Sequence, residues 1–280
     1  MDNKRYDLSN VLVTGASGTI GKAICSILKY NKINFKKLSK YNKNKRFFLE
    51  NTKSVQKLSK FINPSLIIHS AIDNKFKPNL KVNILMMKNL VEFFKCPIIY
   101  ISSVSVYSGS KQNYLSEKID KYALDTKYSL VKKRCEDILI SRRFKKDLCI
   151  RMPGLFSNTR KDGVIYHLIK RFKNKDYKIS FFNLDKQWQC IHIKHFKFYF
   201  IKILKMKINS INVINIGYKD SVSINKMIKI LNKKLPETNK IMIKNKSTTT
   251  KLNLSRLKKI TNKIFKLEEG IKLLWRSNEK

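Results

Sequence analysis

The sequence has few glycines, prolines, cysteines and acidic residues. Its 280 residues include 8 glycines, 5 prolines, 5 cysteines and 2 tryptophans, and only 19 acidic residues stand against 61 lysines and arginines. No apolar run approaches the roughly 18 residues of a membrane-spanning helix, so we expect no such helix. The start, MDNKRYDLSN, is polar and the next apolar run has the length of a short strand, which predicts no signal peptide and a cytoplasmic location.

The cysteines are odd in number and scattered, and no two of them have the spacing of metal ligands. An even and regularly spaced set would indicate a disulfide framework. This set predicts reduced thiols, mostly in the core, and no metal site. The five residues are Cys25, Cys96, Cys135, Cys149 and Cys190.

The excess of basic residues gives a formal net charge of +42. One interpretation is an anionic partner, such as nucleic acid, a membrane surface or a phosphate-bearing substrate. The other is composition alone, because Lys, Asn and Ile are abundant everywhere, including the loops. The lysines are spread along the chain and do not form one tail, which argues against nucleic acid and favours composition.

Apolar runs of strand and helix length alternate through the first half of the chain. Five predicted strands are separated by amphipathic segments, a pattern typical of an α/β fold whose parallel sheet carries helices on both faces. The strands are expected at residues 10–14, 33–39, 65–71, 97–107 and 147–154, and the helices at 19–30, 54–62, 79–95 and 128–144.

The alternation weakens after residue 157. We therefore predict a sheet domain over residues 1–157 and a smaller substrate-binding lobe over 158–280, with interleaved contacts. The lobe is expected to contain a strand at 211–217 and helices near 223–233 and 266–275. Hydrophobic residues make up 42% of the chain, which is enough for a sizeable core.

Three of the eight glycines lie in one stretch, VLVTGASGTIGKAICSIL, between the first strand and the first helix. Gly15 permits a tight turn, Gly18 lets the backbone approach a pyrophosphate, and Gly21 allows close packing of the helix. The helix N-terminus supplies free N–H groups and the positive end of a dipole. The sequence thus predicts a dinucleotide site at this turn that also includes Ser17, Thr19 and Ile20.

The spacing of these glycines resembles that of the short-chain dehydrogenase/reductase superfamily, whose members carry Tyr-x-x-x-Lys. The segment YSLVK supplies Tyr128 and Lys132, and four residues along a helix place both side chains on one face. A phenol is a poor acid or base at neutral pH unless a nearby ammonium favours the phenolate. The pair is therefore the expected proton-exchanging group, and both residues are expected to contact the cofactor.

The segment YISSVSVYS is similar to the Ser-Ser-x-x-Val-Tyr-Gly pattern of the extended branch, the NAD-dependent epimerase/dehydratase family. Alignment on Val106 and Tyr107 makes Ser103 the catalytic hydroxyl, which would hydrogen-bond the substrate oxygen beside the tyrosine. Ser102 and Ser105 are then bystanders. The resemblance implies a Rossmann-type doubly wound sheet with a smaller C-terminal substrate lobe.

Further segments resemble the same family along nearly the whole chain. LIIHSA resembles a strand that places Ser70 and Ala71 near the cofactor, with His69 interpreted as a core residue. Asn83 resembles the family's helix asparagine. IRMPGLF resembles the segment that places Pro153 and Gly154 near the nicotinamide, and the stretches at 188–196, 248–260 and 267–274 resemble its later segments.

The sequence departs from the family pattern after the second strand. Enzymes that choose NAD usually carry an acid there to bind the ribose hydroxyls, and this strand ends FKKLSKYNKNKR without one. Ser39 and Lys40 stand where a 2′-phosphate would lie. We therefore expect NADP as the preferred cofactor and NAD as the alternative.

Two departures concern the substrate. The 4,6-dehydratases of the family carry an Asp-Glu pair after the catalytic hydroxyl, where this chain has Val104 and Ser105, which argues against a dehydratase. In the segment that often holds the nucleotide phosphates, this chain departs at Trp188, Gln189, Lys194 and His195. Three basic residues could hold a diphosphate, although a solvated surface position is the favoured interpretation for each: Lys170, Arg171 and Lys186.

The resemblance implies an NAD(P)-dependent epimerase or ketone reductase acting on a nucleotide-activated sugar, by hydride transfer assisted by Ser103, Tyr128 and Lys132. A homodimer through 79–95 and the Tyr128 helix is a further family expectation. The alternative is a non-catalytic scaffold of the same fold that binds a dinucleotide or a polyanion such as RNA. The basic, aromatic segment 194–208 permits membrane-surface contact, but a helix packed on the sheet is favoured.

Overall fold

The chain forms two compact units. The computed structural model describes residues 5–38, 48–73, 77–118, 124–158, 164–174, 189–207, 212–233 and 250–276. Unit 1 comprises residues 1–110, 120–152 and 199–214, and unit 2 comprises 111–119, 153–198 and 215–280. The boundary predicted after residue 157 lies near the crossing at 152–153. The chain crosses between the units more than once. Residues 111–119 belong to unit 2 although unit 1 residues flank them in sequence, and residues 199–214 belong to unit 1 although unit 2 residues flank them.

Unit 1 is built on a parallel sheet, and this confirms the predicted α/β, Rossmann-like fold class. In the described residues the sheet has six strands in the order β2-β1-β3-β4-β6-β9. The strands are β1 (Val11–Thr14), β2 (Phe35–Leu38), β3 (Leu66–His69), β4 (Ile98–Ser103), β6 (Leu148–Met152) and β9 (Val213–Asn215). The pairings of β1 with β2 and β3, of β3 with β4, and of β4 with β6 are all parallel.

The strand order reverses direction at β1. The chain adds β2 on one side of β1 and then returns to add β3 and β4 on the other side. In open sheets of this kind, ligands bind outside the carboxyl ends of the strands at such a switch point. The topology therefore favours a ligand site at the carboxyl ends of β1, β3 and β4.

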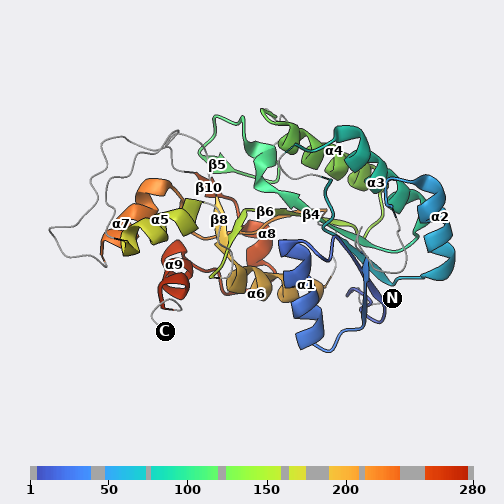
Figure 1. Cartoon of the computed structure of the whole chain (residues 1–280), viewed down its shortest axis with the longest axis horizontal. Helices are drawn as coiled ribbons and strands as arrows, with labels where there is room; N and C mark the ends of the chain where they lie inside the picture. The colour runs from blue at the N-terminus through green and yellow to red at the C-terminus, as the bar shows by residue number, and fades with distance from the viewer. Residues whose placement is uncertain are drawn as a thin grey trace. The chain divides into compact units, whose positions relative to one another are not determined.

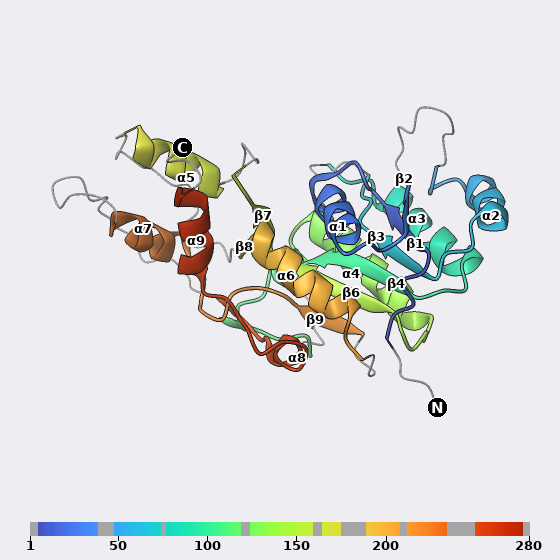
Figure 2. The same ribbon diagram turned by 90° about the horizontal axis from the view of Figure 1, so that it is seen from below.

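Helices cover both faces of this sheet. Residues of α2 (Thr52–Phe61), α3 (Leu80–Phe93) and α4 (Lys127–Ser141) join Leu12, Ile67 and Ile98 in one buried cluster. Neighbouring strand residues such as Val13 and Ile68 point to the opposite face and are also fully buried. There α1 (Thr19–Tyr30) packs on β1 and β2, and Figures 1 and 2 show α3 beside α4. Burial on both faces explains why these strands read as continuous apolar runs.

Two predicted strands end earlier than expected, each for a local reason. β4 stops at Ser103, because the Ser103 Oγ accepts a hydrogen bond from the Ser105 N–H and starts a 3-10 helix, η1 (Val104–Tyr107). The strand predicted at 147–154 is divided at Pro153, which has no N–H to offer a neighbour. β6 lies before it and β7 (Gly154–Phe156) after it.

Unit 2 contains two small parallel sheets, one of β5 (Tyr114–Leu115) with β10 (Lys251–Leu252) and one of β7 with β8 (Cys190–His192). Its core holds two buried histidines beside Tyr218, whose hydroxyl accepts a hydrogen bond from the His192 N–H at 2.9 Å. The His195 ring stacks on Phe265 with centroids 3.8 Å apart. Its other helices in the described residues are α5 (Val164–Lys173), α7 (Ile224–Asn232), α8 (Ser255–Lys258) and α9 (Leu267–Arg276).

The basic, aromatic segment 194–208 contributes most of α6 (Ile193–Leu204). Its apolar side chains, including Phe196, Tyr199 and Phe200, are buried. The segment therefore forms a helix whose apolar side chains are buried, and its packing on the sheet stays a prediction. Among the described residues, no helix combines the length and apolar character needed to cross a membrane.

Gly21 and Gly18 form a matched pair for a stability test. A Cβ at Gly21 would overlap the carbonyl oxygen of Gly15, whereas a Cβ at Gly18 would meet nothing closer than 3.4 Å. We expect Gly21→Ala to lower the free energy of unfolding by more than about 2 kcal/mol. Gly18→Ala should change it by less than about 1 kcal/mol. Urea unfolding of both variants checks this, and equal losses would contradict the packing role of Gly21.

Stability should fall as the solution is acidified through the range of the buried histidines. Burial lowers the pKa of His69 to about 3 and that of His192 and His195 to about 4, from 6.5. Each is neutral when folded and takes up a proton first in the unfolded chain. Each histidine therefore lowers the free energy of unfolding by about 1.4 kcal/mol for every unit by which the pH falls between 6.5 and its folded pKa.

His195→Phe keeps the ring stacked on Phe265 and removes one of these titrations. Its free energy of unfolding should depend less steeply on pH than that of the wild type between pH 6.5 and 4, by about 1.4 kcal/mol per unit. Urea unfolding across this range measures the difference. Parallel curves for the two proteins would show that His195 is not held neutral by the fold.

Candidate functional site

The turn that contains Gly15 and Gly18, called the glycine turn below, lies at the switch point of the sheet. Gly15 follows β1 and has φ +68°, a left-handed conformation that favours glycine. A Cβ there would lie 2.5 Å from the Ala71 nitrogen, because the chain that leaves β3 passes directly against the turn. Neither Gly15 nor Gly21 has room for a side chain, which agrees with the tight turn and the close helix packing expected of them.

The start of α1 is open to solvent. Gly18 is its N-cap and, among the described residues, no side chain caps the helix, whereas Asn51, Asn79 and Thr126 cap α2, α3 and α4. Ser17, Gly18 and Thr19 are exposed, and Ile20 is half-buried. An uncapped helix start among exposed residues is suited to an anion, because the N–H groups of a first helical turn have no acceptor within the helix. Because the protein itself leaves space at Gly18, these residues fit the diphosphate of a dinucleotide.

The end of β3 is tied to the end of β1. The Ser70 N–H and hydroxyl both donate to the Thr14 carbonyl, at 3.2 and 2.7 Å. The Thr14 hydroxyl and the Nδ1 of His69 form a hydrogen bond of 2.7 Å. Burial, and then the charge of Lys132, lower the pKa of His69, so the ring is neutral. His69 is a buried core residue, as the sequence predicted, and it orders the strand ends beside the turn.

Helix α4 presents Tyr128 and Lys132 on one face. It begins at a capping box of Thr126 and Ser129, which fixes the register of the first turn that contains Tyr128. Lys132 is buried and its Nζ donates to the Ile101 carbonyl at 2.8 Å. The same Nζ lies 5.7 Å from the centroid of the half-buried Tyr128 ring. The tyrosine and its ammonium neighbour are therefore brought together as expected.

Ser103 ends β4 and is half-buried. Its Oγ accepts from the Ser105 N–H at 3.1 Å, a bond that leaves its hydroxyl proton to be donated. Helix α4, which carries Tyr128, packs on both β4 and η1. Ser103 lies at the junction of β4 and η1, so it belongs to the segment that α4 contacts. Val104 and Ser105 follow it, and the Ser105 Oγ is buried without a partner among the described residues.

Other predicted residues lie outside the described part of the chain or in unit 2. Ser39 and Lys40 lie outside the described residues, as do Trp188 and Lys186. Pro153 and Gly154 belong to unit 2, where the Gly154 N–H donates to the Gln189 carbonyl at 3.0 Å. Their predicted place near a nicotinamide stays a prediction.

The basic and polar residues considered for the phosphates of a substrate also lie in unit 2. Lys170, Arg171 and Lys194 are exposed. The side-chain nitrogen of Gln189 is buried and donates to Thr250, at 2.9 Å to its carbonyl and 2.8 Å to its hydroxyl. Gln189 therefore serves the packing of unit 2.

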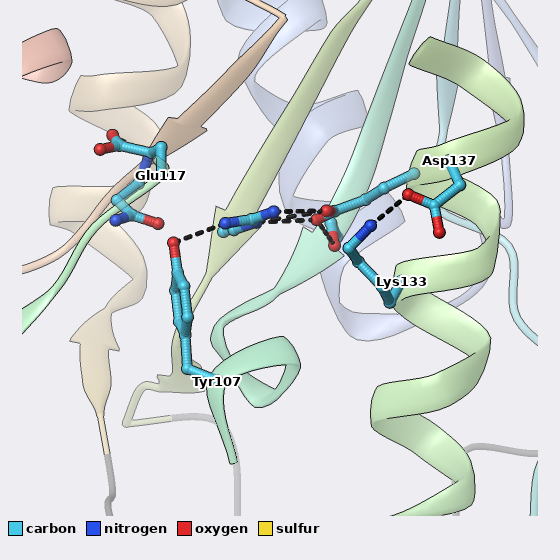
Figure 3. A network of polar contacts seen from close by, with 8 residues as sticks. Tyr107, Glu117, Lys133 and Asp137 are labelled. Atoms are coloured by element: carbon cyan, nitrogen blue, oxygen red, sulfur yellow. Dashed lines mark hydrogen bonds and ion pairs between the residues drawn. The ribbon is translucent and has the colours of Figure 1, made fainter. Parts of the chain in front are cut away.

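Sequence reasoning missed a buried polar network behind the site. The Glu136 carboxylate accepts from the Ser102 hydroxyl at 2.5 Å and from Arg151 Nη2 at 2.7 Å. Arg151 Nη1 donates to the Tyr107 hydroxyl at 2.7 Å (Figure 3). The sequence alone indicates that Ser102 is a bystander, and the structure shows that it belongs to this network. The available signal was Glu136 itself, which stands four residues after Lys132 on the same helix face.

Known structures share this fold over nearly all of the chain. The enzyme WbmG of Bordetella bronchiseptica, in complex with NAD, is 13% identical with a TM-score of 0.77, over 96% of this chain and 94% of that chain. The UDP-glucuronic acid 4-epimerase of Bacillus cereus, in complex with UDP-glucuronic acid and NAD, is 21% identical with a TM-score of 0.69, over 96% and 99%. The dTDP-glucose 4,6-dehydratase of Bacillus anthracis, in complex with NAD, is 15% identical with a TM-score of 0.72, over 96% and 97%.

A sequence search of curated proteins finds no match. The likeness to solved structures, at these identities, concerns the fold. The model of the NAD dependent epimerase/dehydratase family matches residues 11–217, which include the glycine turn, the end of β4 and the Tyr128 helix. On that match, the chain belongs to the NAD-dependent epimerase/dehydratase family.

Proposed function

We propose that this chain is an enzyme that uses NAD or NADP to epimerise or reduce a nucleotide-activated sugar. The observation that carries the proposal is the arrangement in unit 1, where Lys132 is buried beside the Tyr128 ring on a helix that packs on the Ser103 segment. The open helix start at Gly18 supports the cofactor. A similar solved structure, a 4-epimerase in complex with UDP-glucuronic acid and NAD, supports the class of substrate.

Each residue of the site has a distinct task in the proposed reaction. When bound, a nicotinamide supplies a carbon that accepts and returns a hydride. Tyr128 exchanges a proton with the reacting sugar oxygen, and the ammonium of Lys132 stabilises negative charge on the phenol oxygen. Ser103 donates a hydrogen bond from its hydroxyl group to the same sugar oxygen and keeps its proton, while its own oxygen accepts a hydrogen bond from the Ser105 N–H.

The type of reaction follows from which acids and bases are present. Removal of water from a sugar needs a further acid and base, and Val104 and Ser105 after Ser103 provide neither. We therefore propose an epimerase or ketone reductase. Because the similar structures include a 4,6-dehydratase, substrate assays should include dTDP-glucose besides the UDP-sugars.

The choice of dinucleotide is a separate part of the proposal. Ser39 and Lys40 favour NADP on sequence grounds, but they lie outside the described residues. The three solved structures compared above are complexes with NAD and give the NADP preference no support. A calorimetric titration of each reduced dinucleotide into the protein distinguishes the two.

Gly18→Ala should weaken binding of the preferred dinucleotide at least 10-fold. The added methyl group is accommodated by the protein but occupies the space through which the diphosphate would approach the backbone. Calorimetric titration of wild type and variant measures the change, and unchanged urea unfolding shows that the variant is folded. Equal affinity in the two proteins would place the diphosphate elsewhere.

Tyr128→Phe should retain dinucleotide affinity within about 3-fold and lower kcat by about 10² to 10⁴-fold, because only proton exchange is lost. The assay follows conversion of UDP-glucose, UDP-glucuronic acid and dTDP-glucose with NAD and with NADP. A variant as active as the wild type would remove Tyr128 from the mechanism.

The net charge of +42 supports one rival, a scaffold that binds polyanions. It predicts that the wild type binds neither dinucleotide and binds RNA with a strong salt dependence. Binding of a dinucleotide together with conversion of any of the three nucleotide sugars would exclude that rival.

A further inference from the structure

A buried ion pair links α4 to the end of β6, and a hydrogen bond from Ser102 joins the end of β4 to the same carboxylate. Glu136 on α4 is completely buried, and Arg151 on β6 is 1% exposed. The guanidinium donates from Nε to one carboxylate oxygen at 3.0 Å and from Nη2 to the other at 2.7 Å. This two-point contact fixes the orientation of both groups as well as their distance.

Two residues near the candidate catalytic serine join this pair, one directly before it and one four residues after it. Ser102, which precedes it, is 2% exposed and donates its hydroxyl to Glu136 at 2.5 Å. Tyr107, which ends η1, is 1% exposed and accepts from Arg151 Nη1 at 2.7 Å. Figure 3 shows Tyr107 joined by a dashed line to this network, with Lys133 and Asp137 paired on α4. The short segment that contains Ser103 is thus held at both ends.

Glu136 also continues the face of α4 that carries the proposed catalytic residues. Tyr128, Lys132 and Glu136 follow one another at intervals of four residues, which places them along one side of the helix. Lys132 donates to the Ile101 carbonyl, and Glu136 accepts from the next residue of the strand, Ser102. Two adjacent contacts therefore set the height of α4 against the end of β4.

Stability alone does not account for such a pair. A buried ion pair can often be replaced by apolar side chains without loss of stability, because both charges lose their hydration. The pair instead fixes the position of the Ser103 segment, because Glu136 is hydrogen-bonded to Ser102 and Arg151 is hydrogen-bonded to Tyr107. We propose that Glu136, locked by Arg151, is a positioning residue that fixes Ser103 against Tyr128 and Lys132. The inference rests on the proposed function of that site.

The fold supplies a matched control at the other end of the same strands. Asp147 is 4% exposed and pairs with Arg142 at the end of α4, at 2.6 and 2.8 Å. It also accepts from the Ile98 N–H at 2.8 Å. This second ion pair links the same helix and strands, but it lies about four residues, or roughly 13 Å along the strands, from the Glu136 pair.

The experiment compares Ser102→Ala and Glu136→Gln with Asp147→Asn. We expect the first two to lower kcat for the converted nucleotide sugar by about 10 to 100-fold, with KM and dinucleotide affinity changed less than 3-fold, because the reacting groups are misplaced and not lost. Amide hydrogen exchange of residues 103–107 should become faster in both. Asp147→Asn should lower the melting temperature and leave kcat within 2-fold and this exchange unchanged.

Each outcome bears on the proposal. Unchanged kcat and unchanged exchange at 103–107 in Ser102→Ala would overturn it, as would an equal loss of kcat in Asp147→Asn. If Glu136→Gln does not fold, Ser102→Ala still decides, since it leaves the ion pair intact. If the wild type converts no nucleotide sugar, the proposed function fails, and the exchange comparison alone shows whether Glu136 positions the Ser103 segment.

Discussion

A buried ammonium group constrains the whole carboxyl edge of unit 1. Lys132 is 4% exposed, and burying such a charge is costly unless it is hydrogen-bonded. Its Nζ reaches the Ile101 carbonyl and lies 4.8 Å from the centroid of the Tyr100 ring. These contacts require α4 to lie close to the end of β4. That approach in turn brings Tyr128 to the Ser103 segment, and the positive charge helps to keep the nearby His69 neutral.

The same edge collects the other parts of the site because the strand order reverses there. The glycine turn after β1 and the Ser70–Ala71 segment after β3 pass so close together that Gly15 has no room for a side chain. On the next strand, Ser103 lies at the equivalent end. The glycine turn and the proposed catalytic residues are therefore products of one topology, although Ser103 and Tyr128 lie 88 and 113 residues after Gly15 in sequence.

Local signals explain what the sequence could predict. The first helix was predicted at 19–30 and found there, because glycines precede it and its apolar residues repeat at helical spacing. The strands β1, β3 and β4 are predictable because burial on both faces makes them almost continuously apolar. The strand predicted at 211–217 is present as β9, but its assignment to the smaller lobe is wrong, because β9 is the sixth strand of the large sheet. In unit 2, β5, β7 and β8 have two or three residues each, too few to show a period, and they were not predicted as separate strands.

The polar network around Glu136 illustrates what sequence alone could not give. Ser102 lies opposite Arg151 in the register of β4 and β6, a pairing of residues 49 positions apart that only the assembled sheet defines. Glu136 reaches both from the helix above. The sequence motif that identifies Ser103 therefore does not identify the residues that hold it in position. The contact between Ser102 and Glu136 is visible only in the structure.

The most direct test of the account is a crystal structure of the protein grown with NAD or NADP. We expect the diphosphate to lie against the backbone of Gly18 at the start of α1, with the nicotinamide beside Tyr128 and Ser103. A dinucleotide bound away from the carboxyl edge of the sheet, or none at a saturating concentration, would contradict the proposed function.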